Sequence, residues 1–178
     1  MTSPARARLL DTATRLFYAE GVHTVGIDRI IAEAGVAKAT FYKHFPAKDT
    51  LVIAYLAKEY ARQREALEAL PGTGTERVER IFTLLGDLSC GPGFRGCPFL
   101  NAAAEFPDPE HPVRLVVADY REWFRGLMRD LLERSGRDDA AAKADLLLLI
   151  RDGLAVSGGL GDETAVAAGV RAALVLAA

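Results

Sequence analysis

The chain has 178 residues, of which half are apolar and 26% are charged, a balance typical of a soluble globular protein. Its longest apolar runs, at 146–150 and 172–178, are too short to span a bilayer. The N-terminus lacks the apolar region of a signal peptide, and the chain has only two cysteines. We therefore expect reduced thiols and a cytoplasmic location.

The net charge of −2 argues against a wholly basic nucleic-acid binder, but the charge is unevenly distributed. Residues 1–64 contain ten Lys or Arg against six Asp or Glu, a net charge of +4. Residues 65–178 contain twelve against eighteen, a net charge of −6. Such an asymmetry suggests that the N-terminal part meets a polyanion, with chance scatter as the alternative.

Taken in order, the chain has the pattern of helices throughout. Apolar residues at helical spacing, with glycine and proline between the segments, predict helices over these ranges: 4–20, 27–34, 37–44, 48–70, 75–89, a short helix from Pro98, 112–134, 138–157 and 163–177. The prediction is an all-α fold of about nine helices. We expect an N-terminal domain at 1–47 and a helical bundle at 48–178, with the helix at 48–70 as connector.

The segment from Glu33 to Leu51, EAGVAKATFYKHFPAKDTL, places a glycine before a short helix rich in cations and aromatic residues. Two short helices joined by a glycine-containing turn form a helix-turn-helix unit, and Gly35 can adopt the positive φ that such a turn needs. Phe41 and Phe45 lie four residues apart, so they share one face of the second helix and are expected to pack inward. The opposite face then carries these residues: Lys38, Ala39, Thr40, Tyr42, Lys43 and His44.

Cations and hydroxyls on such a face reach phosphate oxygens, while small and aromatic side chains can lie against sugars or thymine methyl groups. Lys48 begins the next helix, where free backbone N–H groups also favour a phosphate. The pattern predicts a helix that contacts DNA, with an amphipathic hairpin that has a solvated basic face as the alternative.

The run from Leu9 to Val52 resembles the N-terminal domain of TetR-type transcriptional regulators, and the similarity covers roughly residues 6–52 without a gap. It includes the first-helix ending LFYAEG, the turn AGV, the recognition helix TFYKHF and the pattern F-x-x-K-D-x-L that enters the fourth helix. The resemblance implies a palindromic DNA operator as partner. It also implies contacts with phosphates and grooves at the following residues: Lys38, Thr40, Tyr42, Lys43, His44 and Lys48.

The chain departs from this family pattern at two positions. Ala37 stands where family members usually have Ser or Thr, and Ala47 where they have Ser or Asn. Both are expected N-cap positions, where alanine typically costs about 0.5–2 kcal/mol. Each alanine also removes a side chain that could contact a phosphate.

The resemblance further implies that the rest of the chain forms a bundle that pairs with a second copy and holds a small-molecule pocket. The last two helices, within 138–177, are rich in small and apolar residues, as helices that pack against a symmetry mate often are. We therefore expect a homodimer through these helices. The alternative is that they cap the core of a single chain.

The expected pocket lies between the helix at 75–89, the short helix after Pro98 and the helix near 112–134. Aromatic and flexible apolar side chains with a few polar ones describe a ligand site, although they also describe an ordinary core. The expected ligand-binding residues are Phe82, Leu85, Phe94, Cys97, Phe99, Asn101, Glu105, Trp123, Phe124 and Met128.

The two cysteines, Cys90 and Cys97, permit three readings besides structural thiols. Their spacing does not fit a zinc site, and no catalytic signature accompanies a Cys97–His111 pair, so we expect no metal, no cofactor and no enzyme. In the third reading, Cys97 precedes Pro98 at a helix start, where a thiol can be reactive and act as a sensor.

These observations predict a ligand-responsive transcriptional regulator, a repressor that releases its operator on binding a small molecule. Two variants stay open: a regulator that senses oxidants or electrophiles through Cys97, and a DNA-binding dimer without an effector. The contrasting class is an enzyme or a ligand-binding module that does not bind DNA.

Overall fold

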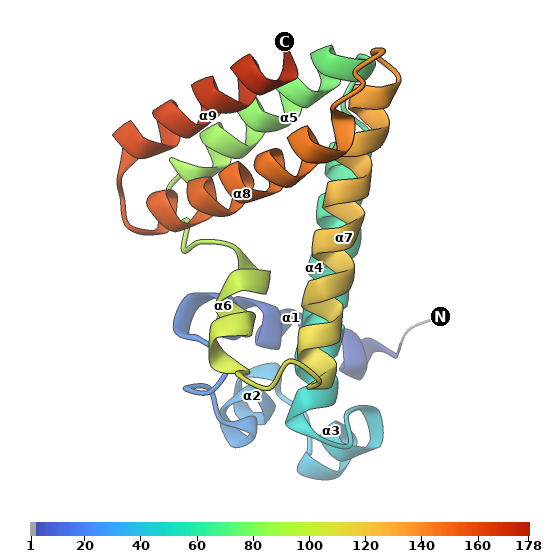
Figure 1. Cartoon of the computed structure of the whole chain (residues 1–178). Coiled ribbons are helices and arrows are strands. Elements are labelled where there is room, and N and C mark those ends of the chain that lie inside the picture. Colours follow the sequence, from blue (N-terminus) through green and yellow to red (C-terminus); the bar gives the residue numbers. More distant parts are fainter. Residues whose placement is uncertain (1–2) are drawn as a thin grey trace. The chain divides into compact units, whose positions relative to one another are not determined.

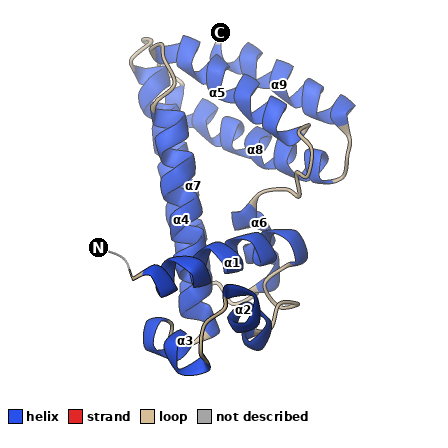
Figure 2. Cartoon of the chain, turned by 180° about the vertical axis from the view of Figure 1, so that it is seen from behind, coloured by secondary structure: helices blue, strands red, loops and turns tan. Residues whose placement is uncertain are grey.

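The computed structural model describes residues 3–178, and these contain nine helices and no strand (Figures 1 and 2). In chain order the helices are α1 (Pro4–Glu20), α2 (Ile27–Ala34), α3 (Lys38–His44), α4 (Lys48–Glu68), α5 (Gly74–Ser89), α6 (Pro98–Glu105), α7 (Pro112–Glu133), α8 (Ala140–Gly159) and α9 (Glu163–Ala177). The all-α prediction is confirmed, and most boundaries differ from the expected ones by no more than two residues.

The chain folds as two compact units. The first consists of residues up to Arg62 together with Pro98–Val117, and the second consists of Gln63–Cys97 and Ala118–Ala178. Helices α4 and α7 contribute residues to both units, whereas α6 belongs to the first. The expected boundary after residue 47 concerns the DNA-binding module and stays a prediction.

In the first unit, α1, α2 and α3 pack against one another around a core that includes Leu16, Phe17 and Ile30. The turn between α2 and α3 is formed by Gly35, which has φ 62° and ψ 45°, the left-handed conformation expected for this glycine. Its N–H donates to the carbonyl of Ala32, and the N–H of Val36 donates to that of Ile31. These bonds satisfy the last carbonyls of α2, so the chain can turn directly into α3.

In the second unit, α5, α8 and α9 lie side by side (Figures 1 and 2) and share one apolar core. The close approach of α5 and α9 requires glycine at position 86, because a Cβ there would lie 2.6 Å from Cγ2 of Val170. The end of α4 is held by Arg77 of α5, whose guanidinium donates to the carbonyls of Leu67 and Glu68. A cation at a helix C-terminus also complements the helix dipole.

Among residues 3–178 no helix is both long and apolar enough to cross a membrane.

Candidate nucleic-acid interface

The recognition helix α3 has one buried and one exposed face. Phe41 is completely buried and Phe45 is 2% exposed, so both aromatic rings pack inward as expected. On the outer face the side chains of Lys38, Ala39, Tyr42 and Lys43 are exposed, and those of Thr40 and His44 are half-buried. Tyr42 is 44% exposed although its ring lies edge-on to Phe41, with ring centroids 5.2 Å apart. The face therefore offers cations, a hydroxyl and an aromatic ring to a partner.

The N-terminus of α3 is uncapped, since the N-cap residue is Ala37 and no side chain accepts from the first N–H groups. Lys38 instead pairs with Asp28 of α2, with Nζ 3.0 Å from Oδ1. The hydrogen bond that Lys38 donates to Asp28 raises the pKa of Lys38, so the side chain stays charged. Both groups are well exposed, so this pair orients Lys38 more than it stabilises the fold.

The start of α4 places Lys48 beside α3. Burial lowers the pKa of Lys48, while the nearby carboxylates of Glu105 and Asp49 oppose this effect. Ala47 precedes this helix and cannot cap it, but Thr50 compensates in part. Its Oγ accepts from the N–H of Ala47 at 3.2 Å and donates to the carbonyl of Ala47 at 2.6 Å. This is the return half of a capping box, and it holds the entry to α4 in place.

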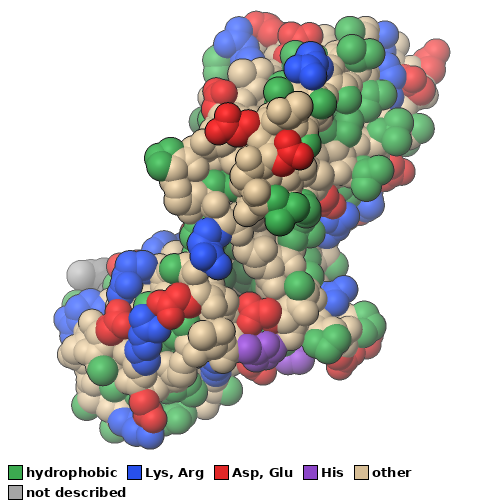
Figure 3. Space-filling model, turned by 90° about the vertical axis from the view of Figure 1, so that its left-hand side faces the viewer, with side chains coloured by type: hydrophobic (Ala, Val, Ile, Leu, Met, Phe, Trp, Pro, Cys, Tyr) green, Lys and Arg blue, Asp and Glu red, His purple; other side chains and the backbone are tan. Residues whose placement is uncertain are grey.

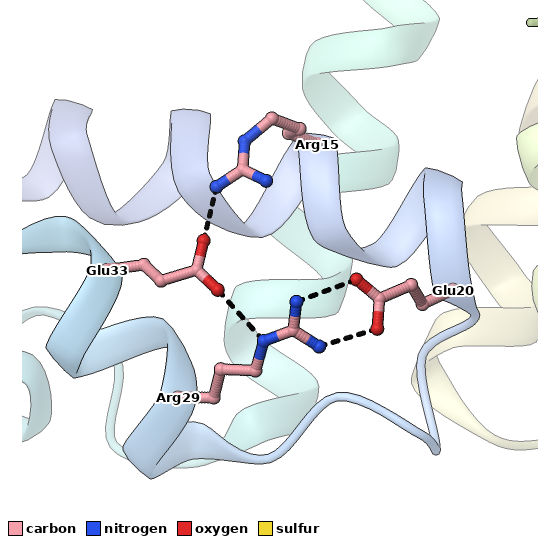
Figure 4. Close-up of polar contacts among 4 residues, drawn as sticks. All are labelled: Arg15, Glu20, Arg29 and Glu33. Atoms are coloured by element: carbon pink, nitrogen blue, oxygen red, sulfur yellow. Dashed lines mark hydrogen bonds and ion pairs between the residues drawn. The ribbon is translucent and has the colours of Figure 1, made fainter.

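An ion-pair network joins α1 to α2 (Figure 4). Arg29 of α2 binds both carboxylate oxygens of Glu20 on α1 and also pairs with Glu33, which Arg15 of α1 binds from the other side. The hydrogen bonds from Arg29 and Arg15 lower the pKa values of Glu20 and Glu33, respectively. Because all four side chains are exposed, the network orients the two helices but contributes little to the stability of the fold.

Sequence reasoning missed one cation near α3. The guanidinium carbon of Arg6 on α1 lies 5.1 Å from the centroid of the Phe45 ring, at the C-terminal end of α3. A cation–π contact of this kind holds an arginine in place without neutralising its charge. The run PARAR at the start of α1 was the available signal, but only the packed structure places it beside the recognition helix.

Comparison with known proteins identifies the family. The family model described as bacterial regulatory proteins, tetR family, matches residues 9–55. The chain is 33% identical to the HTH-type transcriptional regulator LmrA of Bacillus subtilis over 149 residues, which are 78% of this chain and 77% of LmrA. The crystal structure of SCO4454, a TetR-family transcriptional regulator from Streptomyces coelicolor, matches with a TM-score of 0.87 and 44% identity over 97% of this chain and 95% of that chain.

The chain belongs to the TetR family. It is also 26% identical to the HTH-type transcriptional repressor NemR of Escherichia coli over 139 residues, which are 75% of this chain and 69% of NemR. The resemblance of residues 6–52 is thereby confirmed, and the chain is a TetR-family transcriptional regulator. Regulators of this family bind DNA operators and typically form dimers.

The residues expected to bind a ligand in this TetR-family chain fall into both units. Phe82, Phe124 and Met128 are completely buried in the core of the second unit, and Leu85 and Trp123 pack against that core. Phe94 is half-buried in the loop after α5, and Cys97 is buried at its end. In the first unit Phe99 is buried, Asn101 is exposed, and the Glu105 carboxylate accepts hydrogen bonds from the backbone N–H groups of Val22 and His23. Their role in ligand binding stays a prediction.

Cys97 belongs to a buried polar cluster that sequence reasoning missed. Arg151 of α8 is only 5% exposed, and its Nη2 lies 2.9 Å from Sγ of Cys97 and 2.9 Å from the hydroxyl of Tyr120. Its Nη1 lies 2.7 Å from a carboxylate oxygen of Asp152. Tyr120 in turn donates to Oε1 of Gln63 at 2.7 Å.

The cluster changes the pKa values of two side chains. Burial disfavours the charge of Arg151, but Cys97, Tyr120 and Asp152 outweigh it and raise the pKa of Arg151. Burial raises the pKa of Tyr120 to about 12, against an opposing contribution from Arg151. A buried charge of this kind persists only because it is paired and hydrogen-bonded. The spacing of Arg151 three to four residues from the buried residues Leu147, Leu148, Leu154 and Ala155 was the signal that it faces inward.

A cavity of about 270 Å³ opens between α5 and α9 in the second unit. It is lined by Thr83, Gly86, Asp87, Cys90, Glu163, Val166, Ala167 and Val170, and none of the residues expected to bind a ligand is among them. The part of the chain that the structure describes contains no group of three or more His, Cys, Asp or Glu side chains that could hold a metal ion.

Proposed function

We propose that this TetR-family regulator is a cytoplasmic, homodimeric repressor that releases its operator when a small molecule binds. The observation that carries the DNA-binding part is the two-faced helix α3, with Phe41 and Phe45 inside and Lys38, Tyr42 and Lys43 outside. The name of the relative NemR, a transcriptional repressor, supports repression.

The proposed operator contacts combine the outer face of α3 with the start of α4. Lys38, Thr40, Tyr42, Lys43 and His44 would contact the major groove and its phosphates, with Ala39 permitting close approach. Lys48 would bind a phosphate together with the free N–H groups of the first turn of α4. In a symmetric dimer the two α3 helices would enter successive major grooves, about 34–36 Å apart. The operator is therefore expected to be palindromic.

The proposed dimer interface is the outer face of α8 and α9. Leu146, Leu149 and Val156 of α8 and its C-cap residue Leu160 are 46%, 67%, 55% and 80% exposed, and Val175 of α9 is 76% exposed. The first four residues are spaced by three, seven and four positions, so they form a continuous stripe of the kind that two packed helices share. An exposed apolar surface of this kind is typical of a protein–protein contact.

We propose that the effector binds to the residues predicted from the sequence, because they combine a large apolar surface with a few polar groups. A ligand can displace the operator only if it binds the non-binding conformer of the protein more tightly than the DNA-bound one. Helix α4 begins beside α3 with Lys48 and continues into the second unit, so it would carry the change between the two sites.

The proposal is tested with a duplex that the protein recovers from a pool of randomised DNA. A panel of small apolar compounds is then titrated while the fluorescence of Trp123, the single tryptophan, is followed together with anisotropy of the labelled duplex. We expect a saturable change in emission and release of the duplex over the same concentration range. A compound that saturates the emission change without altering DNA affinity would contradict the ligand switch at this site.

A second candidate is a thiol-based regulator, favoured by the contact between Arg151 and Cys97. The guanidinium lies 2.9 Å from Sγ, and cysteines that react with oxidants and electrophiles typically lie beside a cation. With hydrogen peroxide, the sulfur would bond to one oxygen as the O–O bond breaks, giving a sulfenic acid and water. If Cys97 is the sensor, peroxide should release the duplex from the wild type and not from Cys97→Ser. Release from both proteins would contradict this candidate.

A further inference from the structure

The last residue of α6 holds the turn that leads into the helix-turn-helix. Glu105 accepts the backbone N–H of Val22 at 2.8 Å and that of His23 at 2.5 Å, and its Oε2 lies 3.4 Å from Nδ1 of His23. One carboxylate therefore binds three groups of the turn between α1 and α2. Hydrogen bonds to a charged acceptor are about twice as strong as neutral ones, so this is the main polar contact between α6 and that turn.

A group of three rings adjoins this contact. The ring of Phe106 contacts those of both His23 and His111, with centroid separations of 5.0 and 4.7 Å. Nε2 of His111 lies 3.3 Å from a carboxylate oxygen of Asp49 in the first turn of α4. Each histidine thus has a carboxylate on another element: α6 for His23 and α4 for His111. Figure 3 shows histidine side chains lying next to acidic ones on one face.

The surrounding charges fix the end of α6. Arg114 of α7 donates to the carbonyl of Phe106 at 3.0 Å and to that of Ala103 at 3.4 Å, and so caps the helix. Lys48 of α4 is close enough to Glu105 for the carboxylate to favour its charge. Of the acidic groups in the following loop, Asp108 accepts the N–H of Glu110 and is therefore turned toward its own backbone.

We propose that Glu105 is a positioning residue for DNA binding: from the end of α6 it fixes the turn between α1 and α2. This inference rests on the proposed binding of an operator by α3. The turn matters because α2 starts four residues after His23 and carries Asp28, which orients Lys38 on the recognition helix. A loosened turn would therefore disturb Lys38, a proposed DNA contact, through helix α2 alone.

The decisive experiment compares the DNA affinity of the wild type with that of Glu105→Gln. Affinity is measured for a duplex that the wild type selects from randomised DNA. We expect Glu105→Gln to weaken binding roughly three- to tenfold, since the hydrogen bonds to a charged acceptor are weakened.

The matched control is Glu110→Gln, which removes the same charge from the exposed loop and should retain the wild-type DNA affinity. Hydrogen exchange of the Val22 and His23 amides in the free protein gives an independent readout, and Glu105→Gln should accelerate both.

Wild-type DNA affinity together with wild-type amide exchange in Glu105→Gln would overturn the proposal. If the wild type selects no duplex at all, the proposed operator binding fails. Amide exchange and thermal melting of the same variants then still decide whether Glu105 holds the turn.

Discussion

Leu149→Glu tests the proposed dimer interface at its most informative position. Leu149 is 67% exposed in the single chain, so its substitution should change the stability of that chain by no more than about 0.5 kcal/mol. In a symmetric dimer the same leucine is buried twice. Full burial of a leucine contributes about 1.5–3 kcal/mol, so covering the exposed two-thirds contributes about 1–2 kcal/mol per copy.

The two copies together therefore contribute about 2–4 kcal/mol to association, and an unpaired buried carboxylate adds a further cost. We expect the dissociation constant of the dimer to rise on the order of a hundredfold or more. Sedimentation velocity over a concentration series measures this change, and circular dichroism confirms that the monomer remains folded.

Two further variants serve as controls for this prediction. Leu88→Glu on α5 alters a leucine that is 52% exposed but lies outside the stripe, and it should remain dimeric. Leu147→Glu, next to Leu146 in the same leucine run, should unfold the chain because Leu147 is completely buried. A folded Leu149→Glu protein that dimerises as tightly as Leu88→Glu would place the interface elsewhere.

Three other predictions concern DNA contacts and the buried cluster. Tyr42→Ala and Lys48→Ala should each weaken operator binding in a mobility-shift assay while the dimer stays folded. For Lys48→Ala, the slope of the logarithm of affinity against the logarithm of salt concentration should also become shallower by about one. Arg151→Met should destabilise the protein by roughly 3 kcal/mol in urea unfolding, because Cys97 and Tyr120 lose a buried charged partner; unchanged stability would contradict this network. Because the pKa of Tyr120 is raised to about 12 from an ordinary 10.0, the stability that its neutral form contributes is present below pH 10 and is lost as the pH rises toward 12. Tyr120→Phe should abolish that alkaline loss in thermal melts.

The DNA-binding helices were predictable because their signals are local. The period of the apolar residues, the glycine at position 35 and the pair Phe41 and Phe45 all lie within one short segment, and the structure confirms the turn and both buried rings. The absent cap at Ala37 was predictable for the same reason. The role of Thr50 at the start of α4 was missed, because attention to the N-cap residue alone overlooks a side chain three positions later.

The second unit was less predictable because its signals are not local. The run Leu146–Leu149 is apolar at every position, so helical periodicity cannot tell which leucines face the core and which face outward. The structure buries Leu147 and Leu148 and exposes Leu146 and Leu149. Arg151 was overlooked for a related reason: its partners Cys97 and Tyr120 lie 54 and 31 residues away in the chain. Only tertiary packing reveals that this charge is buried.

The charge asymmetry between the two parts of the chain also needs reinterpretation. Residues 1–64 contain ten cations, but Arg15, Arg29 and Lys38 are bound to carboxylates within the helix-turn-helix. Lys58 of α4 pairs with Asp11 of α1, and Arg62 and Arg64 form ion pairs within α4. Among the residues that the structure describes, the other four cations form no ion pair with a carboxylate. Arg8 donates to the carbonyl of Ala34, which leaves Arg6, Lys43 and Lys48 on or next to α3 and the start of α4.

This small set agrees in position with the proposed contacts, whereas the total of ten cations does not. Counterion release depends on the phosphates that a protein neutralises, not on its formal charge. A cation already paired with a carboxylate must give up that pair before it gains a phosphate, so it contributes less to affinity. The excess of positive charge in the sequence therefore agrees with the proposal that the N-terminal part of the chain meets DNA. Under that proposal, the cations on α3, at the start of α4 and beside Phe45 are the ones that phosphates can neutralise without breaking an ion pair.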